Sequence, residues 1–283
     1  MNCFRDADLK RFVACALKED IGSDDITAKV AAPGNPRVNA VIVANESGIL
    51  CGMNIVKLIF KQLDGSVKFS SCLKDAAKIH GGQVIAKINA RAQSILSAER
   101  TALNFLGFLS GIATATQAFV KKARPFKVKI LDTRKTLPGL RALEKYAVRI
   151  GGGFNHRFGL DEMILVKENH IDIAGWETLR RNLKNLNKPK IKLEIETRNL
   201  KEFQDAFFLK PDIIMLDNMS VGEVRRAVHL RNKISTASPK LEASGNISLN
   251  NISAYAASGI DFISLGTLTK DIDSLDFSLA IKK

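Results

Sequence analysis

The stretch VKILDTRKTLPGLRALEKYAVRIGGGFNHRFGL, residues 128–160, joins a short apolar run to a dense set of basic side chains. The apolar run ends at Asp132, and helical periodicity over residues 140–150 precedes three consecutive glycines, so the pattern predicts a strand, a loop and a helix. Such a density of positive charge predicts an anion site. The basic residues from Asp132 onward are Arg134, Lys135, Arg141, Lys145, Arg149, His156 and Arg157.

The same type of short apolar run recurs through the rest of the chain. Each run ends in a polar residue or glycine, and helical segments separate the runs, as a β/α barrel requires. Only about six strands are evident, which predicts an incomplete barrel. The runs are residues 128–131, 164–166, 191–195, 213–216, 241–243 and 262–265, and the residues that end them are Asp132, Lys167, Glu196, Asp217, Ser244 and Gly266.

The first part of the chain reads as a mixed α/β region. Ser97 is a good helix N-cap, so a long helix is expected over residues 98–123, with Gly107 and Gly111 marking close packing of another element. The uncharged part of this helix is too polar for a membrane span, so a buried helix is expected. The other predicted elements are helices over 4–18 and 54–63 and strands over 38–44, 67–72 and 84–90.

Composition limits the classes of partner. A net charge of +14 indicates either nucleic acid or small, multiply anionic substrates, and an aromatic content of only 6% disfavours base stacking. The four cysteines form no C-x-x-C pair and read as thiols in a reducing compartment. The N-terminus has no apolar core of signal-peptide length, so a cytoplasmic location is expected.

Carboxylates lie at the ends of two neighbouring predicted strands. Glu194 and Glu196 face the same side of their strand, and Asp217 closes the next one. Carboxylates on neighbouring strands could hold Mg²⁺ or sugar hydroxyls. Alternatively, Glu194 and Glu196 could simply pair with Lys135 or Lys167 to neutralise a barrel interior. We expect the neutralising role for Glu194 and a functional role for Glu196 and Asp217.

The loops of the last two strands predict a phosphate site. Small residues there, Ser244-Gly245-Asn246 and Gly266-Thr267, allow close approach of backbone amides. In the basic stretch, His156 and Arg157 suit planar carboxylates. Residues 132–135 and 155–157 are therefore expected to face ligands, whereas the charges of the helix 140–150 are expected to be mostly solvated.

Several segments together resemble the quinolinate phosphoribosyltransferases, the carboxylating nicotinate-nucleotide pyrophosphorylases. The resemblance lies in SAERTALNFL from Ser97, the basic stretch from Asp132, LVKENHI from Leu165, LEIE from Leu193, LDN from Leu216 and LEASGNI from Leu241. It implies an α/β protein with an N-terminal α/β sandwich domain, 1–108 joined by 271–283, and an incomplete β/α barrel, 109–270, like the type II phosphoribosyltransferases.

The resemblance also implies an activity. Quinolinate and phosphoribosyl pyrophosphate (PRPP) would give nicotinate mononucleotide, pyrophosphate and CO₂, a step of de novo NAD biosynthesis that uses Mg²⁺. The assembly would be a homodimer or a hexamer of dimers with shared sites, without nucleic acid or membrane partners. The closest alternative is a molybdenum-associated protein of the same fold. The alternative of another class is a non-catalytic protein that binds nucleic acid.

Site residues carry over by motif. Lys135, Glu196 and Asp217 would be catalytic, and Glu196 and Asp217 would hold Mg²⁺, directly or through water. Two departures from the family pattern, Asn246 in place of a second glycine and Lys270 in place of a histidine, concern the phosphate end. The implied substrate-binding residues are Arg100 from the first turn of its helix in the partner subunit, Thr133, Arg134, Lys135, His156, Arg157, Lys167, Glu196, Asp217, Ser244, Gly245, Asn246, Gly266 and Thr267.

Overall fold

The computed structural model describes residues 6–184, 191–234 and 239–282. Their contacts group into two compact units, one of Met1–Gln117, Pro138–Gly152 and Asp271–Lys283 and one of Ala118–Leu137 and Gly153–Lys270. The expected domain division between residues 108 and 109 stays a prediction, because these units are groups of contacts and not pieces shown to fold separately.

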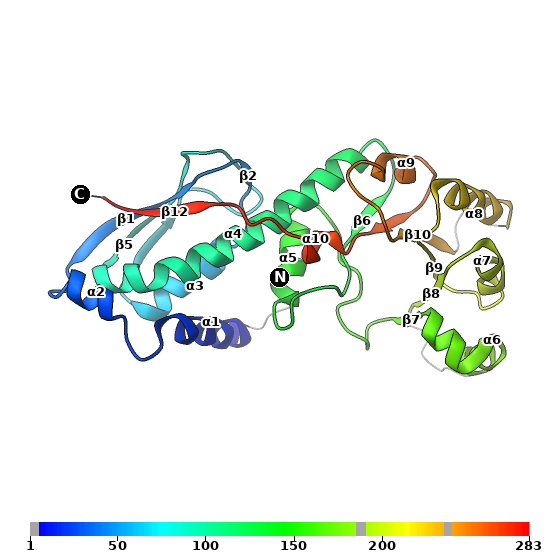
Figure 1. Cartoon of the computed structure of the whole chain (residues 1–283), viewed down its shortest axis with the longest axis horizontal. Helices are drawn as coiled ribbons and strands as arrows, with labels where there is room; N and C mark the ends of the chain where they lie inside the picture. Colours follow the sequence, from blue (N-terminus) through cyan, green and yellow to red (C-terminus); the bar gives the residue numbers. More distant parts are fainter. Residues whose placement is uncertain (1–5, 185–190, 235–238, 283) are drawn as a thin grey trace. The chain divides into compact units, whose positions relative to one another are not determined.

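The first unit is built on a four-stranded antiparallel sheet with the order β12-β1-β5-β3 (Figure 1). Burial does not alternate strictly along β1: Ala40, Val41, Ile42 and Ala44 are all at most 6% exposed, so the second half of this strand belongs to the core of the unit. The strands are β1 (Arg37–Ala44), β3 (Lys68–Ser71), β5 (Val84–Arg91) and β12 (Phe277–Lys282), and a small sheet pairs β2 (Gly48–Ile49) with β4 (Lys78–Ile79).

Helices supply the other layer of this unit. In α3 the residues Ile55, Val56, Ile59 and Phe60 are buried, and their spacing of three and four residues gives one apolar stripe. The helices are α1 (Asp6–Ile21), α2 (Ile26–Ala31), α3 (Met53–Leu63), the part of α4 (Ala92–Ala123) up to Gln117, and α5 (Arg141–Ile150).

The long helix α4 starts earlier than the sequence indicated. It follows β5 directly, so Ser97 lies inside the helix and the predicted N-cap is wrong. Ser97 Oγ instead donates to Asp25 Oδ2 at 2.8 Å, and Asp25 is itself the N-cap of α2. The prediction of close packing at the helical glycines is confirmed, because a Cβ on Gly107 or Gly111 would collide with the backbone carbonyl oxygens of the segment before β12.

Among the described residues, α4 is the one helix that is long and apolar enough to cross a membrane. However, 56% of its most apolar window is buried inside the protein. Length and composition alone are weak evidence for a membrane span, since the core helix of a folded domain has the same properties.

Burial in α5 contradicts one expectation. Two of its charged residues, Glu144 and Lys145, are 0% and 1% exposed, so the helix is not mostly solvated. It ends as predicted, with Gly151 as C-cap and Gly152 at φ 89°, a conformation that favours glycine. Gly151 also packs against the carbonyl oxygen of Ala113, where a Cβ would collide.

The second unit is a parallel six-stranded sheet with the order β6-β11-β10-β9-β8-β7. All six predicted strands are present, and the barrel is incomplete as predicted, since β6 and β7 are the edge strands of this order. In Figure 1, helices α6 to α9 follow one another along the outer side of β7 to β10. The strands are β6 (Lys129–Leu131), β7 (Ile164–Val166), β8 (Leu193–Thr197), β9 (Ile213–Asp217), β10 (Lys240–Ser244) and β11 (Phe262–Ser264), and the helices are α6 (Glu168–Lys184), α7 (Leu200–Phe207), α8 (Val221–Ile234), α9 (Ile252–Ala256) and α10 (Thr267–Lys270).

The strand register sets which side chains share the concave face. Glu196, Met215 and Glu242 lie at one level across β8, β9 and β10. Asp217 and Ser244 form the next level toward the carboxyl ends of the strands, beside Ser264 of β11. The alternate residues, such as Ile195, Leu216, Ala243 and Ile263, are at most 1% exposed. Polar side chains therefore line one face of the sheet, and apolar side chains pack on the opposite face.

Candidate functional site

Asp132, at the end of β6, holds the two halves of the basic stretch together. It is fully buried, and its carboxylate accepts a hydrogen bond from the His156 backbone N at 2.8 Å and one from Asn155 Nδ2 at 2.6 Å. Phe154 forms a bridge with Leu131 on the same strand. The loop that carries His156 and Arg157 is therefore fixed beside the loop that starts with Thr133.

The guanidinium groups of Arg134 and Arg157, one in each loop, are close enough for their positive charges to interact. The Nε atoms of Arg134 and Arg157 are buried and have no hydrogen-bond partner in the part of the chain that the structure describes, while Arg157 Nη1 donates to the Met163 carbonyl oxygen at 2.9 Å. Burial, and next the positive charge of Arg134, lowers the pKa of Arg157, and the charge of Glu194 opposes this shift. Two close cations with unused buried donors make a site suited to an anion with several oxygen atoms.

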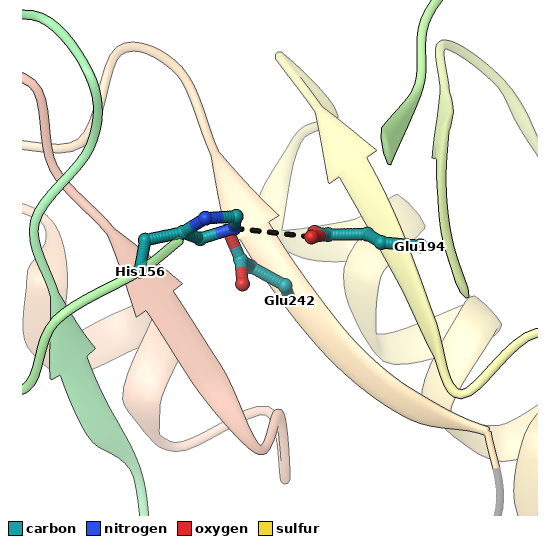
Figure 2. Close-up of side chains that lie close together, drawn as sticks. All are labelled: His156, Glu194 and Glu242. Atoms are coloured by element: carbon teal, nitrogen blue, oxygen red, sulfur yellow. Dashed lines mark ion pairs between the residues drawn. The ribbon is translucent and has the colours of Figure 1, made fainter. Parts of the chain in front are cut away.

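His156 extends from this loop into a pair of carboxylates (Figure 2). Its Nε2 lies 3.1 Å from Glu194 Oε2 and 3.6 Å from Glu242 Oε1. Both carboxyl side chains are fully buried, and their contacts with the imidazole are at ion-pair distance. The expected pairing of Glu194 with Lys135 or Lys167 is therefore wrong, because it faces His156.

Burial, and next the charge of Glu194, raises the pKa of Glu242 to about 8, although His156 opposes the shift. Glu242 is therefore mostly protonated at neutral pH. The ligand atoms of His156, Glu194 and Glu242 lie within 4.8 Å of one another, which is close enough to hold a metal ion. However, His156 Nδ1 accepts a hydrogen bond from the Arg157 backbone N at 2.8 Å. This contact places the imidazole proton on Nε2, where a metal would bind, and so favours protons over a metal in this cluster.

The predicted carboxylates of β8 and β9 lie on the concave face. Glu196 Oε2 lies 2.7 Å from Lys167 Nζ, and the Glu196 side chain is 11% exposed. This is the neutralising pair considered from the sequence, with Glu196 in place of Glu194. Asp217 Oδ2 accepts from Asn218 Nδ2 at 2.7 Å.

The two predicted phosphate loops are tightly built. Lys135 crosses Gly266, where a Cβ would come within 2.9 Å of Lys135 Cδ, and Thr269 Oγ1 donates to the Lys135 carbonyl oxygen at 2.6 Å. Thr133 Oγ1 accepts from the Lys135 backbone N at 3.0 Å. The structure therefore brings Lys135 to the loop after β11.

In the other loop, Gly245 and Asn246 have φ of 86° and 52°, and the preceding Ser244 accepts a hydrogen bond from the Asn218 backbone N at 2.8 Å through its carbonyl oxygen. Positive φ favours glycine and is tolerated by asparagine. Thr267 is exposed at the start of α10, a helix of four residues.

Arg100 belongs to the first unit and is exposed on α4. Since α4 begins at Ala92, Arg100 lies more than two turns into the helix, and its predicted place in the first turn is wrong. Its expected role at a partner subunit's site stays a prediction.

Sequence reasoning missed two residues that shape this site, Asn218 and Glu242, and the anchoring role of a third, Asp132. Glu242 carried a signal, since a charged residue two positions before Ser244 on a strand must share its face. Asp132 was expected to face ligands together with residues 133–135, but it is fully buried and instead holds the loop of residues 155–157. The fixed position of Asn218 depends on a loop distant in sequence.

Comparison with known proteins agrees with this geometry. Residues 25–110 match the N-terminal domain of quinolinate phosphoribosyl transferase, and residues 112–280 match its C-terminal domain. The chain belongs to this family. The predicted family, fold class and enzyme class are therefore confirmed, against the alternative of a non-catalytic basic protein.

Individual relatives extend over nearly the whole chain. A probable nicotinate-nucleotide pyrophosphorylase [carboxylating] of Bacillus subtilis is 40% identical over 96% of this chain and 93% of its own. One from Methanocaldococcus jannaschii is 41% identical over 94% of each chain. The solved structure of the nicotinate-nucleotide pyrophosphorylase from Francisella tularensis superposes with a TM-score of 0.90, at 41% identity, covering 99% of this chain and 98% of that one.

Proposed function

We propose that the chain transfers the phosphoribosyl group of PRPP to the ring nitrogen of quinolinate, with release of pyrophosphate and CO₂, to form nicotinate mononucleotide for NAD biosynthesis. The observation that carries this proposal is the pair of half-buried guanidinium groups of Arg134 and Arg157, whose buried Nε donors have no hydrogen-bond partner among the described residues. A pyridine dicarboxylate supplies the acceptors that these donors lack.

Quinolinate binding follows from the loops at the end of β6. Arg134 and Arg157 bind its carboxylates, and the backbone of His156, held by Asp132, fixes the loop that carries Arg157. Each charge-assisted hydrogen bond to a carboxylate contributes about 1.5–3 kcal/mol, so these loops are sufficient to select a dianion over a neutral ring.

PRPP is bound by residues at the carboxyl ends of the other strands of the sheet and by Lys135. Lys135 and Lys167 attract its phosphates, and the backbone of the loops after β10 and β11 cradles the 5′-phosphate. Glu196 and Asp217 accept hydrogen bonds from the ribose hydroxyls. The residues of the two loops are Ser244, Gly245, Asn246, Gly266 and Thr267, and Thr133 fixes the backbone of Lys135.

The transfer reaction then depends mainly on the positions of the two substrates and on charge stabilisation, and less on proton transfer by side chains. As the bond from C1′ to pyrophosphate breaks, positive charge develops on the ribose, and the carboxylates of Glu196 and Asp217 stabilise it. Lys135 and Lys167 stabilise the departing pyrophosphate. The ring nitrogen forms the new bond to C1′. The adjacent carboxylate then leaves as CO₂, and the electron pair left on the ring carbon takes up a proton.

Mg²⁺ fits this set of donors. Glu196 and Asp217 offer hard oxygen ligands on one face of neighbouring strands, and among the described residues only one oxygen of each accepts a hydrogen bond. Mg²⁺ is commonly held by one or two carboxylates together with water and substrate phosphates. When bound, it neutralises the charge of the pyrophosphate group.

The assembly and location belong to the same proposal. The chain forms a homodimer, or a hexamer of dimers, in which Arg100 reaches the partner subunit's site, and it works in the cytoplasm. Subunits with Arg100→Ala, mixed with subunits with Lys135→Ala, should recover activity after verified subunit exchange. Failure of this rescue would remove Arg100 from a shared site.

The deciding test is an assay of purified protein with quinolinate, PRPP and Mg²⁺ that follows nicotinate mononucleotide and CO₂. Nicotinate in place of quinolinate is the matched control, since it lacks the second carboxylate. Product from quinolinate alone supports the proposal. Product from nicotinate alone would refute it.

A further inference from the structure

The loop after β10 is built around one side chain of the loop after β9. Gly245 leaves room for the amide of Asn218, because a Cβ at Gly245 would lie 2.6 Å from Asn218 Cγ. The Asn218 backbone N donates to the Ser244 carbonyl oxygen at 2.8 Å, so both ends of Asn218 are held by this loop.

A line of three polar side chains results. Asn246 Nδ2 donates to Asn218 Oδ1 at 3.0 Å, and Asn218 Nδ2 donates to Asp217 Oδ2 at 2.7 Å. Asn251 Nδ2 in turn donates to the Asn246 carbonyl oxygen at 3.0 Å and fixes its backbone. We propose that Asn246 is a positioning residue that acts through Asn218 to orient the carboxylate of Asp217 toward PRPP.

The donors and acceptors of these side chains determine how the Asn218 amide is oriented. Asp217 accepts only, so Asn218 must present its NH₂ group to Asp217 and its oxygen to the other side. Asn246 supplies the donor that this oxygen needs. With both ends satisfied, the Asn218 amide has one favoured orientation, and the second oxygen of Asp217 is left for the ligand. The inference rests on the proposed function, because it assigns Asp217 to PRPP.

Substitutions of Asn246 can remove its side-chain hydrogen-bond donor without changing the backbone conformation of the loop. In Asn246→Asp the new carboxylate accepts only, so it favours the reversed Asn218 amide, whose oxygen would then repel Asp217. In Asn246→Gly the side chain is lost, while φ of 52° remains unstrained. Asn250→Asp is the matched control, since Asn250 is an exposed residue of the same loop and gains the same charge.

The expected result is a rise of the KM for PRPP by about three- to tenfold in both Asn246 variants, which corresponds to one lost hydrogen bond. The KM for quinolinate and the melting temperature of the ligand-free protein should stay unchanged. Calorimetry of PRPP with Mg²⁺, without quinolinate, should show the same loss of affinity. Asn250→Asp should behave as the unaltered chain.

Three outcomes would overturn the inference: unchanged PRPP affinity in the Asn246 variants, an equal loss in Asn250→Asp, or an equal rise of both KM values together with a lower melting temperature, which marks a structural role. If the unaltered chain made no nicotinate mononucleotide from quinolinate, the proposed function would fail instead. The calorimetric comparison does not depend on turnover and keeps the two failures distinct.

Discussion

Replacing Glu242 by glutamine should make the stability of the protein much less dependent on pH. Glu242 is fully buried, and burial together with the charge of Glu194 raises its pKa from 4.5 to about 8. Between these values the unfolded chain releases the proton that the folded chain retains. The folded state then binds more protons, so the free energy of unfolding falls as pH rises from about 5 to 8.

The size of the effect follows from the same interval. At about 1.4 kcal/mol for each pKa unit, the loss between these pH values has an upper limit of about 5 kcal/mol, and relaxation around the charge lowers it to about 2–4 kcal/mol. Glutamine keeps the shape of the protonated carboxyl group and has no proton to lose. The variant should therefore be clearly more stable than the unaltered chain at pH 8 and similar to it at pH 5.

The measurement is urea unfolding at pH 5, 6, 7 and 8, followed by the fluorescence of Trp176, the sole tryptophan, which lies on α6 in the same unit as Glu242. Glu177→Gln, at an exposed position, is the control and should leave the pH profile unchanged. Parallel profiles for Glu242→Gln and the unaltered chain would show that Glu242 is ionised in the folded protein across this range. The argument from burial would then be wrong.

Three further substitutions test other parts of the structure. Arg134→Ala should raise the KM for quinolinate at least tenfold while the melting temperature stays within a few degrees, because a charge-assisted hydrogen bond is lost without loss of a core contact; unchanged kinetics would remove Arg134 from the site. Asp132→Ala should weaken quinolinate binding and also lower the melting temperature, because it leaves the His156 backbone N without its acceptor; full activity would show that the loop holds itself. Gly107→Ala should destabilise the protein by about 1–3 kcal/mol in thermal unfolding, because the added methyl group meets a backbone carbonyl oxygen, whereas Asn104→Ala on the exposed side of α4 should be neutral or stabilising.

Most of the second unit could be predicted from the sequence because its pattern is local and repeated. Each strand of a parallel sheet buried on one face by helices is a short apolar run, and its last residue marks the functional edge. The start of α4 could not be predicted in this way. Ser97 has the right residue type for an N-cap, but β5 leads directly into the helix at Ala92. The Ser97 hydroxyl therefore donates to Asp25 instead of capping the helix.

The local sequence pattern also could not predict which cation pairs with each carboxylate of the site. The alternation on β8 correctly placed Glu194 and Glu196 on one face, but which cation each one meets depends on loops far away in sequence. His156 reaches Glu194 because Asp132 holds the loop of residues 155–157 against β6. Burial of Glu144 and Lys145 in α5 was missed for a similar reason, since charged residues are usually placed at the surface.

The burial of Glu194 explains how the guanidinium groups of Arg134 and Arg157 can lie close together before a substrate binds. Arg134 lowers the pKa of Arg157, which means that the pair repel each other in the free protein. Glu194 acts in the opposite direction on the same pKa, so its buried charge offsets part of that repulsion. A carboxylate at the surface would be screened by water and would also compete with quinolinate for the guanidinium donors. A buried carboxylate that faces His156 stabilises the cations, while their Nε donors have no partner among the described residues. The site can therefore be strongly cationic toward a dianion and still fold without one.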